Sequence, residues 1–108
     1  MSEYRRRLGR TGEMVAARFL QRHGIEILAR NVAVGPGELD ILARQGTTRL
    51  VVEVRTVTGR EDPLSAFDAR KRAQVARLAH RVGAARVDLV AIRLTPEAAE
   101  VRWVRAAA

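Results

Sequence analysis

Two pairs of charged residues are the part of this sequence whose types and spacing could do chemistry. Glu38 and Asp40 lie two positions apart, and so do Glu53 and Arg55. Residues two apart in a β-strand share a face, so Asp40 and Glu53 converge if their strands pair as a hairpin. Two carboxylates on adjacent strands can hold Mg²⁺, which takes oxygen ligands and bridges to phosphate. The same residues also fit a solvent-facing sheet surface, where cross-strand ion pairs are common.

Two residues in predicted helices are further candidates. Lys71 interrupts the apolar stripe of its helix, where a charge is not expected. Either its stem packs while the ammonium stays in water, or the ammonium reaches the carboxylates of the sheet. Glu13 lies one turn into an earlier helix, where an acidic residue usually complements the helix dipole. If that helix points at the sheet carboxylates, Glu13 is a further ligand for the metal.

The hydrophobic pattern predicts the elements that must position these residues. Helices are expected over residues 9–23 and 65–82, and strands over residues 26–33, 38–44, 49–57, 87–94 and 101–105. The second helix is expected to open with a capping box formed by Ser65 and Asp68. Residues 1–8 have the composition of a basic, poorly ordered arm. The order αβββαββ predicts one α/β domain over residues 1–108, a mixed sheet with helices packed on it.

Composition narrows the function classes. The 108 residues include 20 Lys and Arg against 12 Asp and Glu, a net charge of +8, and no cysteine. The lack of cysteine excludes disulfide scaffolds, iron–sulfur clusters and thiol catalysis. The positive charge favours nucleic acid as a partner. No signal peptide or membrane span is predicted, which favours a cytoplasmic protein with no membrane partner.

Almost all basic residues are Arg, and several of them are clustered near the N-terminus. Nineteen of the 20 are Arg, and Lys71 is the only Lys. Four cations near the N-terminus could track a phosphate backbone, or form a solvated charged tail. They are Arg5, Arg6, Arg7 and Arg10. One Trp, one Tyr and two Phe offer no aromatic platform for stacking bases.

Several motifs follow one another along the chain. They are Gly9-x-x-Gly12-Glu13-x-x-Ala16, Asn31, Gly37-Glu38-Leu39-Asp40, Val52-Glu53-Val54-Arg55, Lys71 and Arg86-Val87-Asp88. With them the chain resembles, over about residues 5–105, the YraN-type endonuclease-like family. Those are small bacterial proteins similar to the archaeal Holliday-junction resolvases of the PD-(D/E)XK nuclease superfamily. The resemblance implies the restriction-endonuclease-like αβββαβ core, with a mixed central sheet and flanking helices.

The resemblance also implies a ligand set. Asp40 takes the place of the motif Asp, Glu53 that of the first acidic residue of the E-x-K element, and Glu13 that of the helix-borne Glu. These three would bind Mg²⁺ or Mn²⁺ together with the backbone carbonyl of Val54. Glu38 belongs to the family's Gly-Glu-(Ile/Leu)-Asp signature, and no role follows for it.

One position departs from the family pattern. Arg55 stands where the family's Glu-Val-Lys motif has its catalytic Lys. Arg cannot lose its proton, so a general-base role is closed to it, while stabilisation of negative charge on phosphate stays open. Lys71 is the alternative source of an ammonium group.

Three hypotheses follow. The first is a metal-dependent endodeoxyribonuclease that hydrolyses phosphodiesters in structured or branched DNA, with Asp40, Glu53 and either Arg55 or Lys71 as catalytic residues. The similarity to resolvases, which cut paired strands symmetrically, implies a homodimer. The second is a non-catalytic nucleic-acid-binding module that has kept the nuclease fold. The third is an interaction protein in a DNA-processing assembly.

Overall fold

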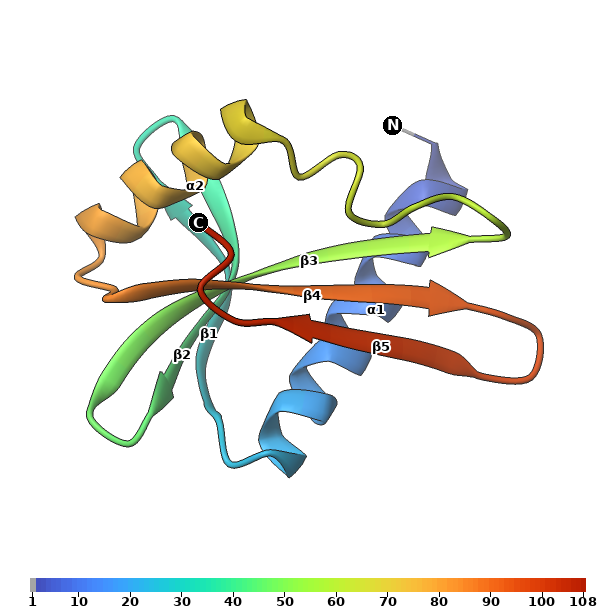
Figure 1. The fold of residues 1–108 in the computed structure, drawn as a ribbon, viewed down its shortest axis with the longest axis horizontal. Coiled ribbons are helices and arrows are strands. Elements are labelled where there is room, and N and C mark those ends of the chain that lie inside the picture. The colour runs from blue at the N-terminus through green and yellow to red at the C-terminus, as the bar shows by residue number, and fades with distance from the viewer. Residues whose placement is uncertain (1) are drawn as a thin grey trace.

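Two helices and five strands follow one another in the computed structural model, which describes residues 2–108. They are α1 (Glu3–Arg22), β1 (Glu26–Val34), β2 (Gly37–Gln45), β3 (Thr48–Thr58), α2 (Ala69–Arg81), β4 (Arg86–Leu94) and β5 (Ala99–Val104). The order αβββαββ is the predicted one, and the strand ends differ by one or two residues. All strands form one sheet in the order β1-β2-β3-β4-β5 (Figure 1). Only β3 and β4 are parallel, because α2 carries the chain back along the sheet between them.

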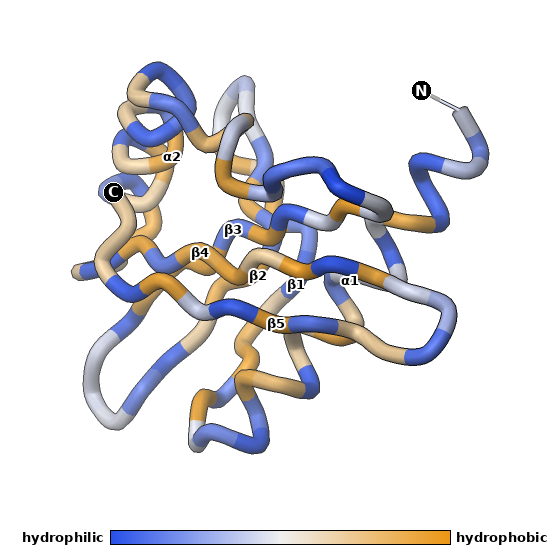
Figure 2. Tube along the Cα trace, turned by 45° about the vertical axis from the view of Figure 1, so that its right-hand side comes forward, coloured by the Kyte–Doolittle hydropathy of each residue, from blue (hydrophilic) through white to orange (hydrophobic). Residues whose placement is uncertain are grey.

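The two helices cover opposite faces of the sheet and so make two hydrophobic clusters. Leu20 of α1 packs in one cluster with Ile41 of β2, and Val75 of α2 packs in the other with Leu39. The central strand β4 contributes to both clusters, as expected for a strand buried on both faces. Figure 2 shows the resulting apolar stretch along β4.

Helix α1 begins earlier than the pattern predicts. Residues 3–8 form its first turns, so the expectation of a poorly ordered arm over residues 1–8 is wrong for this part, and residue 1 lies outside the described residues. Ser2 caps the helix by accepting a hydrogen bond from the Arg5 backbone N–H at 3.1 Å. Glu3 pairs with Arg6 at 3.5 Å and with Arg10 at 3.4 Å, which offsets repulsion among the cations. Neither helix within residues 2–108 is long and apolar enough to cross a membrane.

Helix α2 begins later than predicted, at Ala69 instead of Ser65. Asp68 is itself the N-cap, accepting a hydrogen bond from the Lys71 backbone N–H at 2.9 Å, so the expected capping box is wrong. The Ser65 hydroxyl instead donates to the Asp62 carbonyl at 2.8 Å, which holds residues 62–65 in a turn. The physical reason is that an Asp side chain satisfies the free N–H groups of the first helical turn directly.

Asp88 in β4 is a buried carboxylate with every lone pair engaged. It accepts hydrogen bonds from the Arg86 guanidinium at 2.9 and 3.1 Å, from Trp103 Nε1 at 2.9 Å and from the Ala106 backbone N–H at 3.0 Å. A buried charge is stable only with such partners. Asp88 therefore ties β5 and the C-terminal residues to the sheet and has no oxygen left for a ligand.

Gly12 sets the distance between α1 and β3. A Cβ atom at this position would lie 2.8 Å from the Cβ of Thr56 and closer still to its Oγ1. The helix backbone thus approaches the strand more closely than any side chain permits. Glu13 follows directly, so this contact also places Glu13 against the sheet.

The variant Gly12→Ala is expected to lower the free energy of unfolding by about 1–3 kcal/mol, because the added methyl group overpacks the contact with Thr56. Urea denaturation followed by circular dichroism measures this change. Combining it with Thr56→Ala, which removes the nearest atom, should restore part of the loss.

Gly9→Ala is the matched control, since nothing lies within 4 Å of a Cβ at Gly9 on the same helix. Helix propensity alone should make this variant equally stable or more stable by up to about 1 kcal/mol. Equal stability of the Gly9 and Gly12 variants would contradict the close-contact explanation.

Candidate functional site

The site is centred on a reciprocal contact between Asp40 of β2 and Glu53 of β3. The antiparallel ladder of these strands runs from Gln45↔Thr48 to Ile41↔Val52. At the next position the side chains replace the ladder. The Asp40 backbone N–H donates to Glu53 Oε1 at 3.4 Å, and the Val54 backbone N–H donates to Asp40 Oδ2 at 2.8 Å. The two strands therefore separate around two adjacent carboxylates.

Burial is the main cause that raises the pKa of both carboxyl groups, and a nearby like charge adds to it: Asp40 for Glu53, and Glu38 for Asp40. Glu53 is only 3% exposed. Burial, followed by the charge of Asp40, raises its pKa from 4.5 to about 7, although Lys71 opposes the shift. Burial also raises the pKa of Asp40, although the hydrogen bond from Val54 and the charge of Lys71 oppose it. Burial therefore disfavours the ionised state of both groups, and a nearby positive charge favours it.

Glu13 of α1 belongs to the same electrostatic group. Burial and the charge of Asp40 raise its pKa, while hydrogen bonding from the Asn31 side chain and the charge of Arg30 lower it. Arg30 lies 3.9 Å from the Glu13 carboxylate. Glu13 thus faces the site across the surface of β1.

Asn31 is a site residue to which sequence reasoning assigned no role. Its backbone has a positive φ of 53°, a left-handed conformation that Asn tolerates better than most residues. In the β1–β2 ladder it lies between Arg30↔Ile41 and Val32↔Leu39, which places it opposite Asp40. Its place in the sequence, directly after Arg30 and before the apolar run of residues 32–34, gave no clear signal of this role.

Lys71 provides the ammonium group of the site. From the first turn of α2 its Nζ lies 3.9 Å from Glu53 Oε2. Its side chain is 33% exposed and that of Glu53 is 4% exposed. Of the two alternatives for this residue, the structure shows the one in which the ammonium reaches the carboxylates.

Arg55 lies on β3, half-buried, beside a pocket of about 320 Å³. Its charge lowers the pKa of both Asp40 and Glu53, as the last of several causes. The pocket is also lined by Glu13 and Val54, and on the α1 side by Tyr4, Arg5, Leu8 and Gly9. The pocket therefore opens between α1 and β3, beside the carboxylates.

The four N-terminal cations are not gathered at the site. Arg5 lines the pocket, whereas Arg6 and Arg10 both pair with Glu3 and do not line it. Arg7 is exposed and does not line it either. The helical form of this segment explains the difference, because neighbouring residues of a helix point in different directions.

The donor set suits a hard divalent cation held by few protein ligands. Within residues 2–108, no three His, Cys, Asp or Glu side chains lie close enough together to hold a metal ion. Mg²⁺ is usually bound by one or two carboxylates, with waters and substrate phosphate as its other ligands. Asp40 and Glu53, with the carbonyl of Val54, fit this description. Glu13 contributes charge from farther away.

Comparisons with known proteins agree with the family predicted from the motifs. A family model described as "Uncharacterised protein family UPF0102" matches residues 12–92. A UPF0102 protein of Roseiflexus castenholzii is 42% identical over 112 residues, which cover 94% of this chain and 90% of that relative. A UPF0102 protein of Parafrankia sp. is 53% identical over 78 residues, covering 69% of this chain and 65% of that relative.

A solved structure, that of SSO0001, has the same fold. It superposes with a TM-score of 0.52 at 15% sequence identity, over 91% of this chain and 50% of that one. This chain thus spans about half the length of that neighbour. Together with the observed mixed sheet and flanking helices, the match confirms the predicted α/β fold class.

Replacing the ionisable Glu53 should stabilise the protein at high pH. Because its pKa is raised from 4.5 to about 7, the folded state holds this proton more tightly than the unfolded chain. The stability that protonation contributes is complete below about pH 4.5 and is lost as the pH rises through 7. Glu53→Gln cannot ionise, so at pH 8 we expect its free energy of unfolding to exceed that of the wild type by about 1–3 kcal/mol.

Urea denaturation at about pH 4, 6 and 8 measures this difference, which should vanish at the lowest pH. Glu97→Gln, at the exposed β4–β5 turn, is the control and should show no trend. A Glu53→Gln protein that gains no stability at pH 8 would show that Lys71 compensates Glu53 fully.

Proposed function

The chain belongs to the UPF0102 family, that of the YraN-type proteins, and we propose that it is a metal-dependent nuclease that hydrolyses phosphodiesters in structured or branched DNA. The observation that carries this proposal is the buried pair Asp40 and Glu53 with the Lys71 ammonium 3.9 Å from Glu53. Carboxylates that attract a divalent cation, beside a cation that attracts phosphate, are what hydrolysis of a phosphodiester requires. The net charge of +8 agrees with a polyanionic substrate.

Asp40 and Glu53 would hold Mg²⁺ or Mn²⁺ with the backbone carbonyl of Val54, and Glu13 would support the ion by its charge. When bound, the ion supplies Lewis acidity towards phosphate and lowers the pKa of a coordinated water. The protein orients the ligands beforehand. Val54 N–H holds Asp40 through Oδ2 at 2.8 Å, and no hydrogen bond from residues 2–108 occupies its Oδ1.

Lys71 and Arg55 would act on the substrate phosphate. Both lower the pKa of the carboxylate pair, so both lie within electrostatic reach of the reacting position. Lys71, a compact ammonium on a flexible stem, can follow charge as it develops on phosphate oxygens. Arg55 can neutralise or hold a phosphate oxygen at the pocket but cannot accept a proton.

The pocket between α1 and β3 would receive the part of the substrate next to the reacting phosphate. Arg5 and Arg55 line it from opposite elements, so two guanidinium groups are available to phosphate oxygens there. A homodimer cutting both strands of a branched substrate agrees with the resemblance to resolvases and is part of the proposal.

A non-catalytic nucleic-acid-binding module is the second candidate, and Arg55 favours it. Arg and Lys differ in geometry and in their ability to exchange a proton, so a family motif with Arg in place of Lys can lose its chemistry and keep its fold. Binding would then persist without cleavage.

Asp40→Asn should abolish cleavage and keep binding. We expect the rate on a fluorescent four-way junction with Mn²⁺ to fall by at least about a hundredfold, because the amide removes the charge that would hold the metal. Gel assays of cleavage and fluorescence anisotropy of binding measure the two effects separately.

Glu97→Gln is the matched control and should cut like the wild type. Cleavage that persists in Asp40→Asn would contradict the proposed site. A wild type that binds the junction without cutting it would favour the second candidate.

Variants of Arg55 and of Lys71 should distinguish the roles of these two cations. If Arg55 limits the chemistry, Arg55→Lys should raise the rate about tenfold or more, whereas Arg22→Lys at the far end of α1 should not change it. Lys71→Gln should lower the rate. It should also move the pH profile upward, because Lys71 lowers the pKa of Glu53.

Initial rates between about pH 5 and 9 measure both effects. An unchanged rate and an unchanged pH profile in Lys71→Gln would together show that this ammonium acts on neither the substrate nor Glu53.

A further inference from the structure

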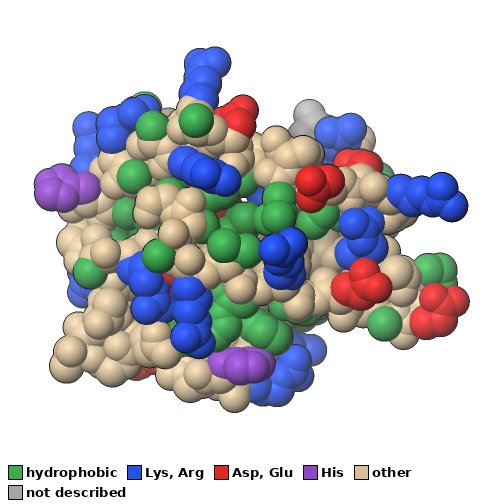
Figure 3. All heavy atoms as spheres, in the orientation of Figure 1, with side chains coloured by type: hydrophobic (Ala, Val, Ile, Leu, Met, Phe, Trp, Pro, Cys, Tyr) green, Lys and Arg blue, Asp and Glu red, His purple; other side chains and the backbone are tan. Residues whose placement is uncertain are grey.

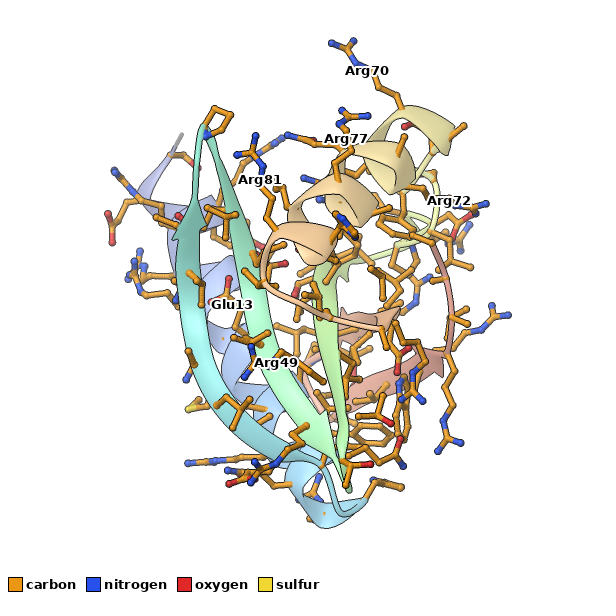
Figure 4. The ribbon with its side chains drawn as sticks, turned by 90° about the vertical axis from the view of Figure 1, so that its left-hand side faces the viewer. Glu13, Arg49, Arg70, Arg72, Arg77 and Arg81 are labelled. Atoms are coloured by element: carbon orange, nitrogen blue, oxygen red, sulfur yellow. The ribbon has the colours of Figure 1, made fainter. Side chains whose placement is uncertain are left out.

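A row of basic side chains runs along the exposed side of α2. Arg70, Gln74, Arg77 and Arg81 are spaced by four, three and four residues, so they share one helix face, and all four are exposed. We call these residues the α2 stripe. The helix contains no acidic residue, and within residues 2–108 none of the three Arg side chains forms a salt bridge. Figure 4 shows the three projecting away from the side of Arg72.

Other cations near α2 serve the fold. The Arg72 guanidinium donates to the Phe67 carbonyl at 3.1 Å and lies over the Phe67 ring. Arg49 of β3 donates to the Val82 carbonyl at 3.0 Å, which satisfies the C-terminal end of the helix. The cations of the α2 stripe make no such contact within residues 2–108.

Helix stability does not account for the stripe. A helix dipole favours cations only in the last turn, where Arg81 lies, and disfavours them at the N-terminus, where Arg70 lies beside Lys71. In the space-filling view, basic side chains surround α2 at the upper left, while most of the acidic ones lie in the right-hand half (Figure 3). Arg81 packs against Gly35 of the β1–β2 turn, but within residues 2–108 no hydrogen bond or salt bridge accounts for the charges of the stripe.

Two contacts hold α2 in a defined position relative to the candidate site. Lys71, next to Arg70, extends to Glu53 at the start of the helix. Farther along, Leu78 packs on the β1–β2 turn so tightly that a Cβ at Gly37 would lie 2.6 Å from its Cδ1. From Gly37, strand β2 leads in three residues to Asp40. The stripe is thus rigidly related to both carboxylates.

A cavity of about 600 Å³ lies between α2 and the β1–β2 turn. Gln74, Arg77 and Arg81 line it from the helix, and Pro36 and Gly37 line it from the turn. Three members of the α2 stripe therefore border one concave surface. Its opposite wall is the β1–β2 turn, from which strand β2 continues to Asp40.

We propose that the α2 stripe binds the phosphate backbone of duplex DNA, beside the strand whose reacting phosphate lies at Asp40 and Glu53. The eleven residue-to-residue steps from Arg70 to Arg81 extend about 16 Å along the helix. One strand of a duplex carries a phosphate about every 3.4 Å of its axis, so the stripe runs past about five phosphates. The position of the reacting phosphate rests on the proposed function, but binding by the stripe does not require cleavage.

The test compares two triple variants with the same loss of charge. One is Arg70→Gln, Arg77→Gln and Arg81→Gln. The control is Arg18→Gln, Arg22→Gln and Arg102→Gln, three exposed positions outside α2. Binding of a fluorescent duplex of about 20 base pairs is measured by anisotropy in EDTA between about 50 and 300 mM salt. Circular dichroism verifies that both proteins are folded.

The stripe variant should bind about 10- to 100-fold more weakly, and the slope of log affinity against log salt should become shallower by about 2–3, near 0.9 for each lost phosphate contact. The control slope should change by less than about 1. Equal losses in both variants would overturn the inference, as would a wild type that binds no duplex or prefers a single strand of equal length. Binding is measured in EDTA, which removes divalent metal ions, so the result does not depend on cleavage. Duplex binding by the stripe can therefore be disproved even if the wild type cuts DNA with a metal, and it can be confirmed even if the wild type does not cut.

Discussion

Two carboxylates stand where the backbone ladder between β2 and β3 would otherwise continue, and the candidate site depends on this interruption. Asp40 and Glu53 each accept a backbone N–H from the opposite strand, so the strands stay joined while they separate. The protein retains this pair although burial raises the pKa of both groups, which disfavours their ionised state. A local loss of stability of this kind is typical of functional sites.

Two glycines determine how the helices meet this pair. At Gly12 the backbone of α1 lies against Thr56, and at Gly37 the β1–β2 turn lies against Leu78 of α2. The first contact brings Glu13 to one side of the carboxylates, and the second holds the helix that carries Lys71 on the other. A negative and a positive side chain thus reach the same pair from opposite layers of the fold. The site is a product of close packing between helices and sheet as much as of the strands themselves.

Arg55 of β3 and Lys71 of α2, the only Lys of the chain, both lie close enough to Glu53 to lower its pKa. The ammonium of Lys71 comes from α2 to within 3.9 Å of Glu53. A charge inside an apolar helical stripe was the sequence feature that singled out Lys71. Its ion pair with Glu53 accounts for that feature, because an opposite charge compensates a partly buried ammonium.

The sequence by itself determined the order αβββαββ, the family and the candidates Asp40, Glu53 and Lys71, because hydrophobic periodicity and short motifs are local properties. Helix starts were predicted less well. Capping by Ser2 and Asp68 depends on which of several polar residues meets the free N–H groups. Only the tertiary structure decided that Asn31 lies opposite Asp40, that Arg5 alone of the four N-terminal cations lines the pocket, and that Asp88 is fully satisfied within the fold. These facts depend on strand register, helix rotation and contacts between distant residues, which no local pattern contains.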